Sequence, residues 1–270
     1  DELPGGPVAA GAPLNVAAHL RALGGAPLLI SRIGADDAAA RRIEAALQRF
    51  GLEAKGVQRD LQHPTGTVQV QMRSDGSHRF LIAEGVAWDH LDREQALQAC
   101  AGLRPAFVYF GSLAQRHPVS REAIRALLHR VEAPRFLDLN LREGASSALA
   151  LESLGLTDWL KVNEDELAQL LRWSGCAGAP ALVRQFELQR LIVTRGPDGY
   201  FSLDALGDLS AEGSGVPDVL LVDSVGAGDA FSACLLAAHL QRKEWAASLA
   251  LANRFAAAIC GQAGASASDP

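Results

Sequence analysis

The residues best suited to chemistry lie between Val222 and Phe231, where an apolar run leads through Gly226-Ala227-Gly228 into small residues. This order predicts a strand, a tight turn and a helix whose first amides have no partner within the helix. Those amides and the positive end of the helix dipole favour an anion such as phosphate, which the glycines allow to approach closely. Asp229 follows, where its carboxylate could accept a proton from a hydroxyl group that attacks a phosphoryl group.

A purely structural interpretation of the same residues is also open. Gly226 and Gly228 could permit a tight turn and nothing more, and Asp229 could be an acidic residue that the helix dipole favours in the first turn. Short glycine motifs often arise by chance. The rest of the chain must therefore decide between the two interpretations.

Short apolar runs alternate with amphipathic segments along most of the chain, which is typical of a mainly parallel sheet covered by helices on both faces. Residues 67–72 and 78–82 instead alternate polar and apolar side chains around Asp75-Gly76, which predicts a β-hairpin that could serve as a lid or a dimer surface. We expect strands at 28–30, 107–110, 136–137, 159–162, 191–193 and 219–222, and helices at 37–50, 120–131, 148–154, 164–171, 228–240 and 245–260.

Asp223 to Asp229 resembles the C-terminal signature of the ribokinase (PfkB) family of carbohydrate kinases, Asp-[Ser/Thr]-x-Gly-Ala-Gly-Asp. Ala10 to Ala17, about two hundred residues upstream, resembles the sugar-site motif of the same family. Two motifs in the family's order are much rarer by chance than one. Further segments similar to family landmarks extend the resemblance over nearly the whole chain: Asp138–Arg142, Asn163–Glu166 and Thr194–Gly199.

The resemblance implies one ribokinase-like, Rossmann-type α/β domain over residues 1–270, with a small β-hairpin lid inserted at about 64–90. It implies ATP-dependent phosphorylation of a sugar hydroxyl, with Asp229 as the general base. The backbone at Gly226, Ala227 and Gly228 would stabilise the migrating phosphoryl group. Asp1, Gly11 and Asn15 would bind the sugar.

ATP and Mg²⁺ are the cofactors that the resemblance implies, with K⁺ as a further candidate. Asn163 and Glu166 would hold Mg²⁺ and the phosphates, Glu166 through water, although both residues also suit a capped helix start. Asp223 is the candidate K⁺ ligand. The remaining candidate nucleotide contacts are Thr194, Gly196, Gly199 and Asn253.

The resemblance also places Asp1 at the end of a hydrophobic first strand. That strand would precede residue 1, and we therefore expect the natural chain to be longer. An ordinary frayed terminus at Asp1 is the alternative.

Fructose or a related ketose is the expected substrate. The residues of the Ala10–Ala17 motif and the short distance from Asp1 to that motif resemble fructokinases. A nucleoside kinase of the same family and a catalytically silent sugar- or nucleotide-binding relative stay open. A dinucleotide-dependent oxidoreductase is disfavoured, because no G-x-G-x-x-G follows the first predicted strand.

Composition limits the classes of partner that the chain is expected to bind. The chain has 270 residues, of which 49% are hydrophobic, and a formal net charge of -6. Scattered arginines in an acidic chain argue against a nucleic-acid surface. The absence of a long apolar run predicts a cytoplasmic protein without membrane contact. A homodimer formed through the lid is a further expectation from the resemblance.

Overall fold

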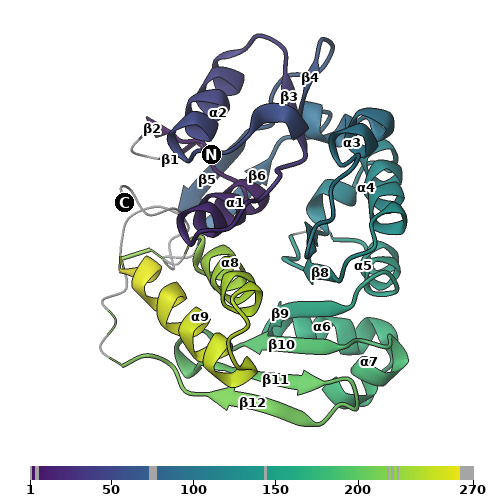
Figure 1. Cartoon of the computed structure of the whole chain (residues 1–270), viewed down its shortest axis with the longest axis vertical. Helices are drawn as coiled ribbons and strands as arrows, with labels where there is room; N and C mark the ends of the chain where they lie inside the picture. Colours follow the sequence, from purple (N-terminus) through teal and green to yellow (C-terminus); the bar gives the residue numbers. More distant parts are fainter. Residues whose placement is uncertain are drawn as a thin grey trace.

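A six-stranded sheet forms the centre of the computed structural model, which describes residues 2–3, 6–72, 78–142, 145–217, 219, 222–223 and 225–261. In spatial order its strands are β12 (Leu209–Gly213), β11 (Tyr200–Asp204), β10 (Arg190–Thr194), β9 (Trp159–Asn163), β8 (Arg135–Asp138) and β7 (Val108–Gly111). The four strands β7 to β10 run parallel, and β11 and β12 extend the sheet as an antiparallel pair. The expected mainly parallel α/β sheet is confirmed (Figure 1).

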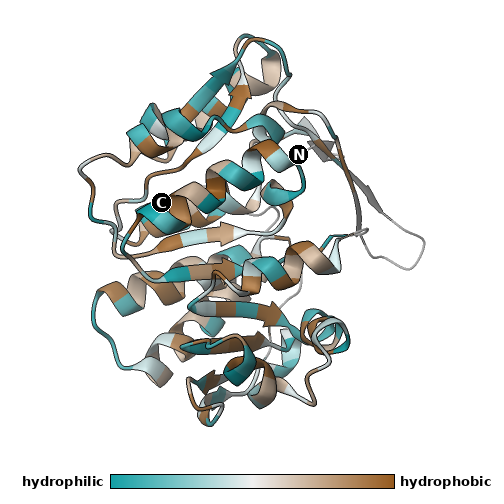
Figure 2. Ribbon diagram, turned by 90° about the vertical axis from the view of Figure 1, so that its right-hand side faces the viewer, coloured by the Kyte–Doolittle hydropathy of each residue, from teal (hydrophilic) through white to brown (hydrophobic). Residues whose placement is uncertain are grey.

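Adjacent residues of the parallel strands pack against opposite faces of the sheet. Phe136 and Trp159 belong to a cluster covered by α8 (Ala227–Leu240) and α9 (Trp245–Cys260). Leu137 and Leu160 belong to the cluster on the other face. Because both faces are buried, the central residues of these strands are mainly apolar, such as Leu191, Ile192 and Val193 of β10. Figure 2 shows such apolar residues in brown along the strands, with hydrophilic residues in teal between them. The helices that cover the second face are α4 (Pro118–Arg130), α5 (Ser147–Leu154), α6 (Glu164–Ser174) and α7 (Ala179–Gln185).

A separate parallel pair, β3 (Ser31–Gly34) and β4 (Val57–Asp60), lies beyond β7. Three helices accompany it: α1 (Ala12–Ala22), which also packs against α8, α2 (Ala38–Arg49) and α3 (Arg93–Ala99). Single turns of 3₁₀ helix complete the described elements: η1 (Ala54–Gly56), η2 (Ala87–His90), η3 (Leu113–Gln115) and η4 (Gly196–Asp198). Within the described ranges no helix is both long and apolar enough to cross a membrane.

The predicted hairpin is confirmed. Strand β5 (Val68–Met72) pairs antiparallel with β6 (His78–Ile82), and the expected Asp75-Gly76 turn lies outside the described residues. Strand β1 (Glu2–Leu3) pairs in parallel with β5 and antiparallel with β2 (Gly6–Pro7). These four strands form a small sheet apart from the main one, which we call the lid sheet (Figure 1).

Two strand predictions were wrong. The strand expected at 28–30 begins only at Ser31, because Leu29 packs in the cluster of α1 and α2, so its apolar character reflects burial and not strand geometry. The strand expected at 219–222 is not formed at its described ends, Val219 and Val222. The Val222 amide instead donates to the Cys260 carbonyl at the end of α9. Helices α1, α3 and α7 were not predicted, and two of them are only seven residues long.

Candidate active site

The start of α8 lies on a large cavity. Gly226, the N-cap residue, has the left-handed φ of 83° that a glycine adopts without strain, and no side chain caps the helix. The first amides of α8 therefore keep their capacity to bind an anion. Gly226, Gly228 and Asp229 line a cavity of about 850 Å³, beside which lies the base of the lid sheet.

Asp229 is almost completely buried, with 6% of its surface exposed. Burial raises the pKa of its carboxyl to about 6, and the charge of Asp138 adds to the rise. The amide of Asn15 and the charges of Lys161 and Arg142 act in the opposite direction. A carboxyl with this pKa is mostly ionised at neutral pH and binds a proton readily, as a general base must.

Asn15 of the N-terminal motif contacts Asp229 of the C-terminal motif. Its Nδ2 donates to Asp229 Oδ2 over 2.8 Å, although 214 positions separate the two residues. Asn15 lies in the first turns of α1, whose N-cap is Gly11 with a φ of 130°. Gly11 and Asn15 both line the cavity. The structure thus brings together the two motifs that the sequence pointed to.

A buried ion pair beneath the helix start was not predicted from the sequence. Lys161, in the middle of β9, lies with its Nζ 2.9 Å from Oδ2 of Asp138 at the end of β8. Tyr109 and Ser232 donate further hydrogen bonds to the same carboxylate. The available signal was a lysine inside an apolar strand, because a buried ammonium group requires an anionic partner.

Asn163 and Glu166 form a capping box at the start of α6. The Asn163 side chain accepts from the Glu166 amide over 2.8 Å, and Glu166 accepts from the Asn163 amide over 2.9 Å. The second carboxylate oxygen of Glu166 accepts from the Leu141 amide, so the box also fixes the loop after β8. Burial raises the pKa of Glu166. Neither residue lines the cavity that contains Asp229.

The other candidate nucleotide residues also lie outside that cavity. Thr194 ends β10 opposite Asn163 of β9. Gly196 begins η4, and Gly199 approaches β12 so closely that a Cβ there would lie 2.1 Å from the Gly213 carbonyl oxygen. Asn253 of α9 donates to the Ser214 carbonyl over 3.0 Å. Gly199 and Asn253 thus both contact the end of β12.

Asp223 lines the cavity, and its carboxylate accepts from the Val225 amide over 2.9 Å. It lies beside Gly226, as its place in the motif predicts. Asp1, the remaining candidate, lies outside the described residues.

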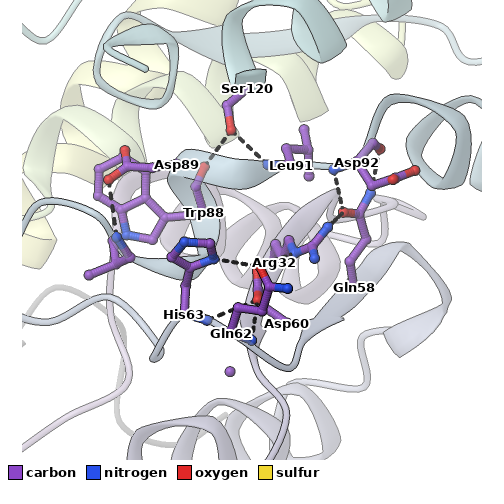
Figure 3. A network of polar contacts seen from close by, with 12 residues as sticks. Arg32, Gln58, Asp60, Gln62, His63, Trp88, Asp89, Leu91, Asp92 and Ser120 are labelled. Carbon is purple, nitrogen blue, oxygen red and sulfur yellow. Dashed lines mark hydrogen bonds and ion pairs between the residues drawn. The ribbon is translucent and has the colours of Figure 1, made fainter. Parts of the chain in front are cut away.

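Trp88 forms part of the cavity wall and stacks on the guanidinium of Arg116, which lies 4.1 Å from the ring centroid. Arg116 also pairs with the buried Asp89 over 2.8 Å. The Ser120 hydroxyl donates to the Trp88 carbonyl. The Asp60 carboxylate accepts from two backbone amides of the turn that leads to the lid sheet (Figure 3). This polar network holds the wall of the cavity at the base of the lid.

Known proteins with similar sequences identify the family to which the chain belongs. The model of the pfkB family of carbohydrate kinases matches residues 7–270. The chain is 31% identical to fructokinase-2 of Oryza sativa subsp. japonica over 238 residues, which are 84% of this chain and 69% of that protein. It is 30% identical to a fructokinase of Salmonella typhimurium, over 84% of this chain and 75% of that protein.

Solved structures show the same fold. A sugar kinase of Pyrococcus horikoshii in complex with ATP superposes with a TM-score of 0.81 at 27% identity, over 95% of this chain and 84% of that chain. A fructokinase of Vibrio cholerae bound to fructose, ADP and potassium gives 0.82 at 24% identity, over 96% of this chain and 86% of that chain. Fold and site together define a ribokinase-like phosphotransferase that acts on small molecules. The chain belongs to the pfkB family of carbohydrate kinases and is an ATP-dependent carbohydrate kinase.

Proposed function

We propose that this kinase phosphorylates a hydroxyl group of fructose or a closely related ketose, in the cavity where Asn15 meets Asp229. The observation that carries the proposal is their 2.8 Å hydrogen bond, because it places the N-terminal motif beside an ionisable carboxylate at a helix start. Fructokinases from rice and Salmonella are among the relatives at 30% identity or more.

In the proposed reaction the acceptor hydroxyl attacks the γ-phosphorus of ATP, its proton passes to the Asp229 carboxylate, and ADP leaves. The amides of Ala227, Gly228 and Asp229 would stabilise the negative charge on the migrating phosphoryl group. Asn15 would orient the carboxylate and bind a sugar hydroxyl, with Gly11 beside it. Asp1, by resemblance, would complete the sugar site.

For the nucleotide we propose Asn163, Thr194, Gly196, Gly199 and Asn253. Both oxygens of Glu166 accept a hydrogen bond from a backbone amide, which leaves lone pairs for water. This arrangement fits a Mg²⁺ ion that keeps its hydration shell, and such an ion would neutralise phosphate charge. Asp223 remains the proposed K⁺ ligand.

The lining of the cavity supports a free sugar over a nucleoside. Its described polar side chains include Asn15, Asp138, Asn140 and Asp229. The aromatic side chains among the described lining residues are Trp88, which stacks on Arg116, and Tyr109, whose hydroxyl donates to Asp138. A lining with more carboxylate and amide groups than aromatic rings favours a free sugar over a nucleobase.

The test is ADP release in Mg²⁺ and K⁺ with fructose, other hexoses, ribose and nucleosides as acceptors. We expect the highest kcat/KM with fructose or a related ketose. A preference for a nucleoside would contradict the substrate, and nucleotide binding without turnover on any acceptor would contradict the reaction. Cytoplasmic location and dimerisation through the lid sheet remain proposals, the second testable by light scattering.

A further inference from the structure

Asn140 lies just beyond the end of β8, and the proposed reaction assigns it no step. Its backbone has a left-handed φ of 48°, which non-glycine residues rarely adopt. Within the described ranges two other non-glycine residues have a positive φ, Glu187 and Arg242, and both are exposed and lie outside the cavity. Asn140 is the one of the three that lines it. A strained backbone at a cavity wall is a reason to look for a function of that residue.

Hydrogen bonds on both sides of Asn140 hold this conformation. The Leu139 amide donates to the Lys161 carbonyl over 3.1 Å. The Leu141 amide donates to the Glu166 carboxylate over 2.7 Å. The backbone that carries the Asn140 carboxamide is therefore fixed in advance, which reduces the entropy that binding a ligand would cost.

The residues around Asn140 alternate between the cavity and the core. Asp138, Asn140 and Arg142 line the cavity. Leu139 and Leu141 pack in the apolar cluster on the face of the sheet opposite α8. The strand end thus presents three polar side chains in succession to the cavity, with the neutral carboxamide between a carboxylate and a guanidinium.

The two charged neighbours place Asn140 near the proposed general base. Besides burial, the charge of Asp138 raises the pKa of Asp229, and the charge of Arg142 lowers it. Because electrostatic interactions weaken with distance, both groups lie close to the Asp229 carboxyl. Within the described residues the carboxamide of Asn140, between them, has no hydrogen-bond partner. Its NH₂ group and its carbonyl oxygen both remain available to a ligand.

We propose that Asn140 is a specificity-determining residue whose carboxamide binds a hydroxyl group of the acceptor sugar. The assignment rests on the proposed function, because it takes the cavity to be the acceptor site. When ionised, Asp138 and Asp229 can only accept hydrogen bonds, so an NH₂ donor beside them complements the lone pairs of hydroxyl oxygens. A carboxamide also accepts, which suits an acceptor with several neighbouring hydroxyl groups.

Glycine is the informative substitution, because it adopts a left-handed conformation without strain. Asn140→Gly removes the carboxamide and keeps the backbone. For the acceptor that the parent protein uses with the highest kcat/KM, we expect kcat/KM to fall about tenfold, mainly through a higher KM, because one hydrogen bond is lost. The KM for ATP should stay unchanged, and the melting temperature should stay within about 3 °C of the parent.

The matched control is Glu187→Gly, which makes the same change at a φ of 53° outside the cavity. It should leave the kcat/KM for the acceptor and the KM for ATP unchanged. Asn140→Ala adds a Cβ that disfavours the left-handed conformation, so it should melt below Asn140→Gly while losing at least as much kcat/KM.

Monodeoxy analogues that keep the phosphorylated hydroxyl show which group Asn140 binds. In the parent, one analogue should react about tenfold less efficiently than the intact acceptor, because it lacks the partner of the carboxamide. Asn140→Gly should no longer distinguish this analogue from the intact acceptor, since both changes remove the same hydrogen bond.

An unchanged kcat/KM in Asn140→Gly would show that the side chain serves only the turn and would overturn the proposal. An equal rise in the KM for ATP, or the same losses with every analogue in both proteins, would overturn it as well. A preferred acceptor other than a ketose would contradict the proposed function alone, because the two proteins are compared on whichever acceptor the parent prefers. Calorimetric titration of both proteins with fructose makes the comparison without turnover, so a parent without turnover would contradict only the proposed reaction.

Discussion

Lys161 and Asp138 form a buried ion pair directly beneath the start of α8. The lysine Nζ lies 3.0 and 2.9 Å from the two carboxylate oxygens of Asp138. The same Nζ would lie 3.3 Å from a Cβ at Gly228, so the pair lies directly under the Gly226–Gly228 turn. The pair therefore couples the packing of β8 and β9 to the position of Asp229.

Lys161→Met should reduce the free energy of unfolding by about 3–5 kcal/mol, because it leaves the Asp138 carboxylate buried without its cation. Urea unfolding measures this loss. The double variant Lys161→Met/Asp138→Asn should be clearly more stable than the sum of the two single changes predicts. If the free energy of unfolding of the single variant fell by less than about 1 kcal/mol, the pair would not contribute substantially to the stability of the fold.

Asp229→Asn should lower kcat by about 10²–10⁴-fold, since the amide cannot accept the proton of the acceptor hydroxyl. The folded pKa of about 6 exceeds the ordinary value of 3.8, so ionising this carboxyl at neutral pH destabilises the fold. The variant should therefore melt at the same temperature or higher. Asp36→Asn, on the exposed surface, is the matched control and should leave both quantities unchanged. Activity of Asp229→Asn within a few-fold of the parent would rule out a general base at this position.

The rate should depend on the ionisation of Asp229. We expect kcat/KM to rise with pH through about 6, as the carboxyl loses its proton. Asn15→Ala removes a hydrogen bond that favours the ionised form, and it should move this acid limb to higher pH. The measurement is a pH profile of both proteins at subsaturating sugar. An acid limb at the same pH in both would show that Asn15 does not affect the Asp229 carboxyl.

His90 should make the fold sensitive to acid. The ring centroid of His90 lies 3.7 Å from that of His63, on which it stacks, and 4.5 Å from that of His117. Burial together with these two histidines lowers the pKa of His90 below 6.5. Asp60 and Asp89 oppose this effect in part. The folded state therefore binds fewer protons than the unfolded state near that pH, and stability falls as the pH decreases below about 6.5.

His90→Gln should reduce the loss of stability between about pH 7.5 and pH 5.5, measured as the change in the urea midpoint. The control is His129→Gln, because His129 is exposed on α4. An unchanged pH dependence in His90→Gln would assign the acid sensitivity to other groups.

The sequence was informative about the fold where apolar runs coincide with strands that are buried on both faces, such as Trp159–Asn163 and Arg190–Thr194. It was misleading at Leu29 and Val222, because an apolar residue can pack beside a helix or remain exposed without joining a sheet. Local patterns do not record which backbone groups find partners.

At the site, the resemblance of the two motifs to the family's signatures predicted that Gly11, Asn15 and Asp229 belong to one site, and the structure places all three on one cavity. The Lys161–Asp138 pair was missed because its partners are 23 positions apart in different strands. The capping box of Asn163 and Glu166 was foreseen as one of two roles, and the structure shows its hydrogen bonds. Their contact with Mg²⁺ and nucleotide stays a prediction.

The hydrogen bond between Asn15 and Asp229 also bears on how the protein is made. Its partners are 214 positions apart, so at about 5–20 residues per second the ribosome needs roughly 10–40 s to synthesise the chain between them. During that time α1 has no α8 to pack against, and its apolar face must be sheltered by other means. The proposed reactive centre is therefore assembled only after α8 has been synthesised, and a nascent chain that stalls before α8 would be inert.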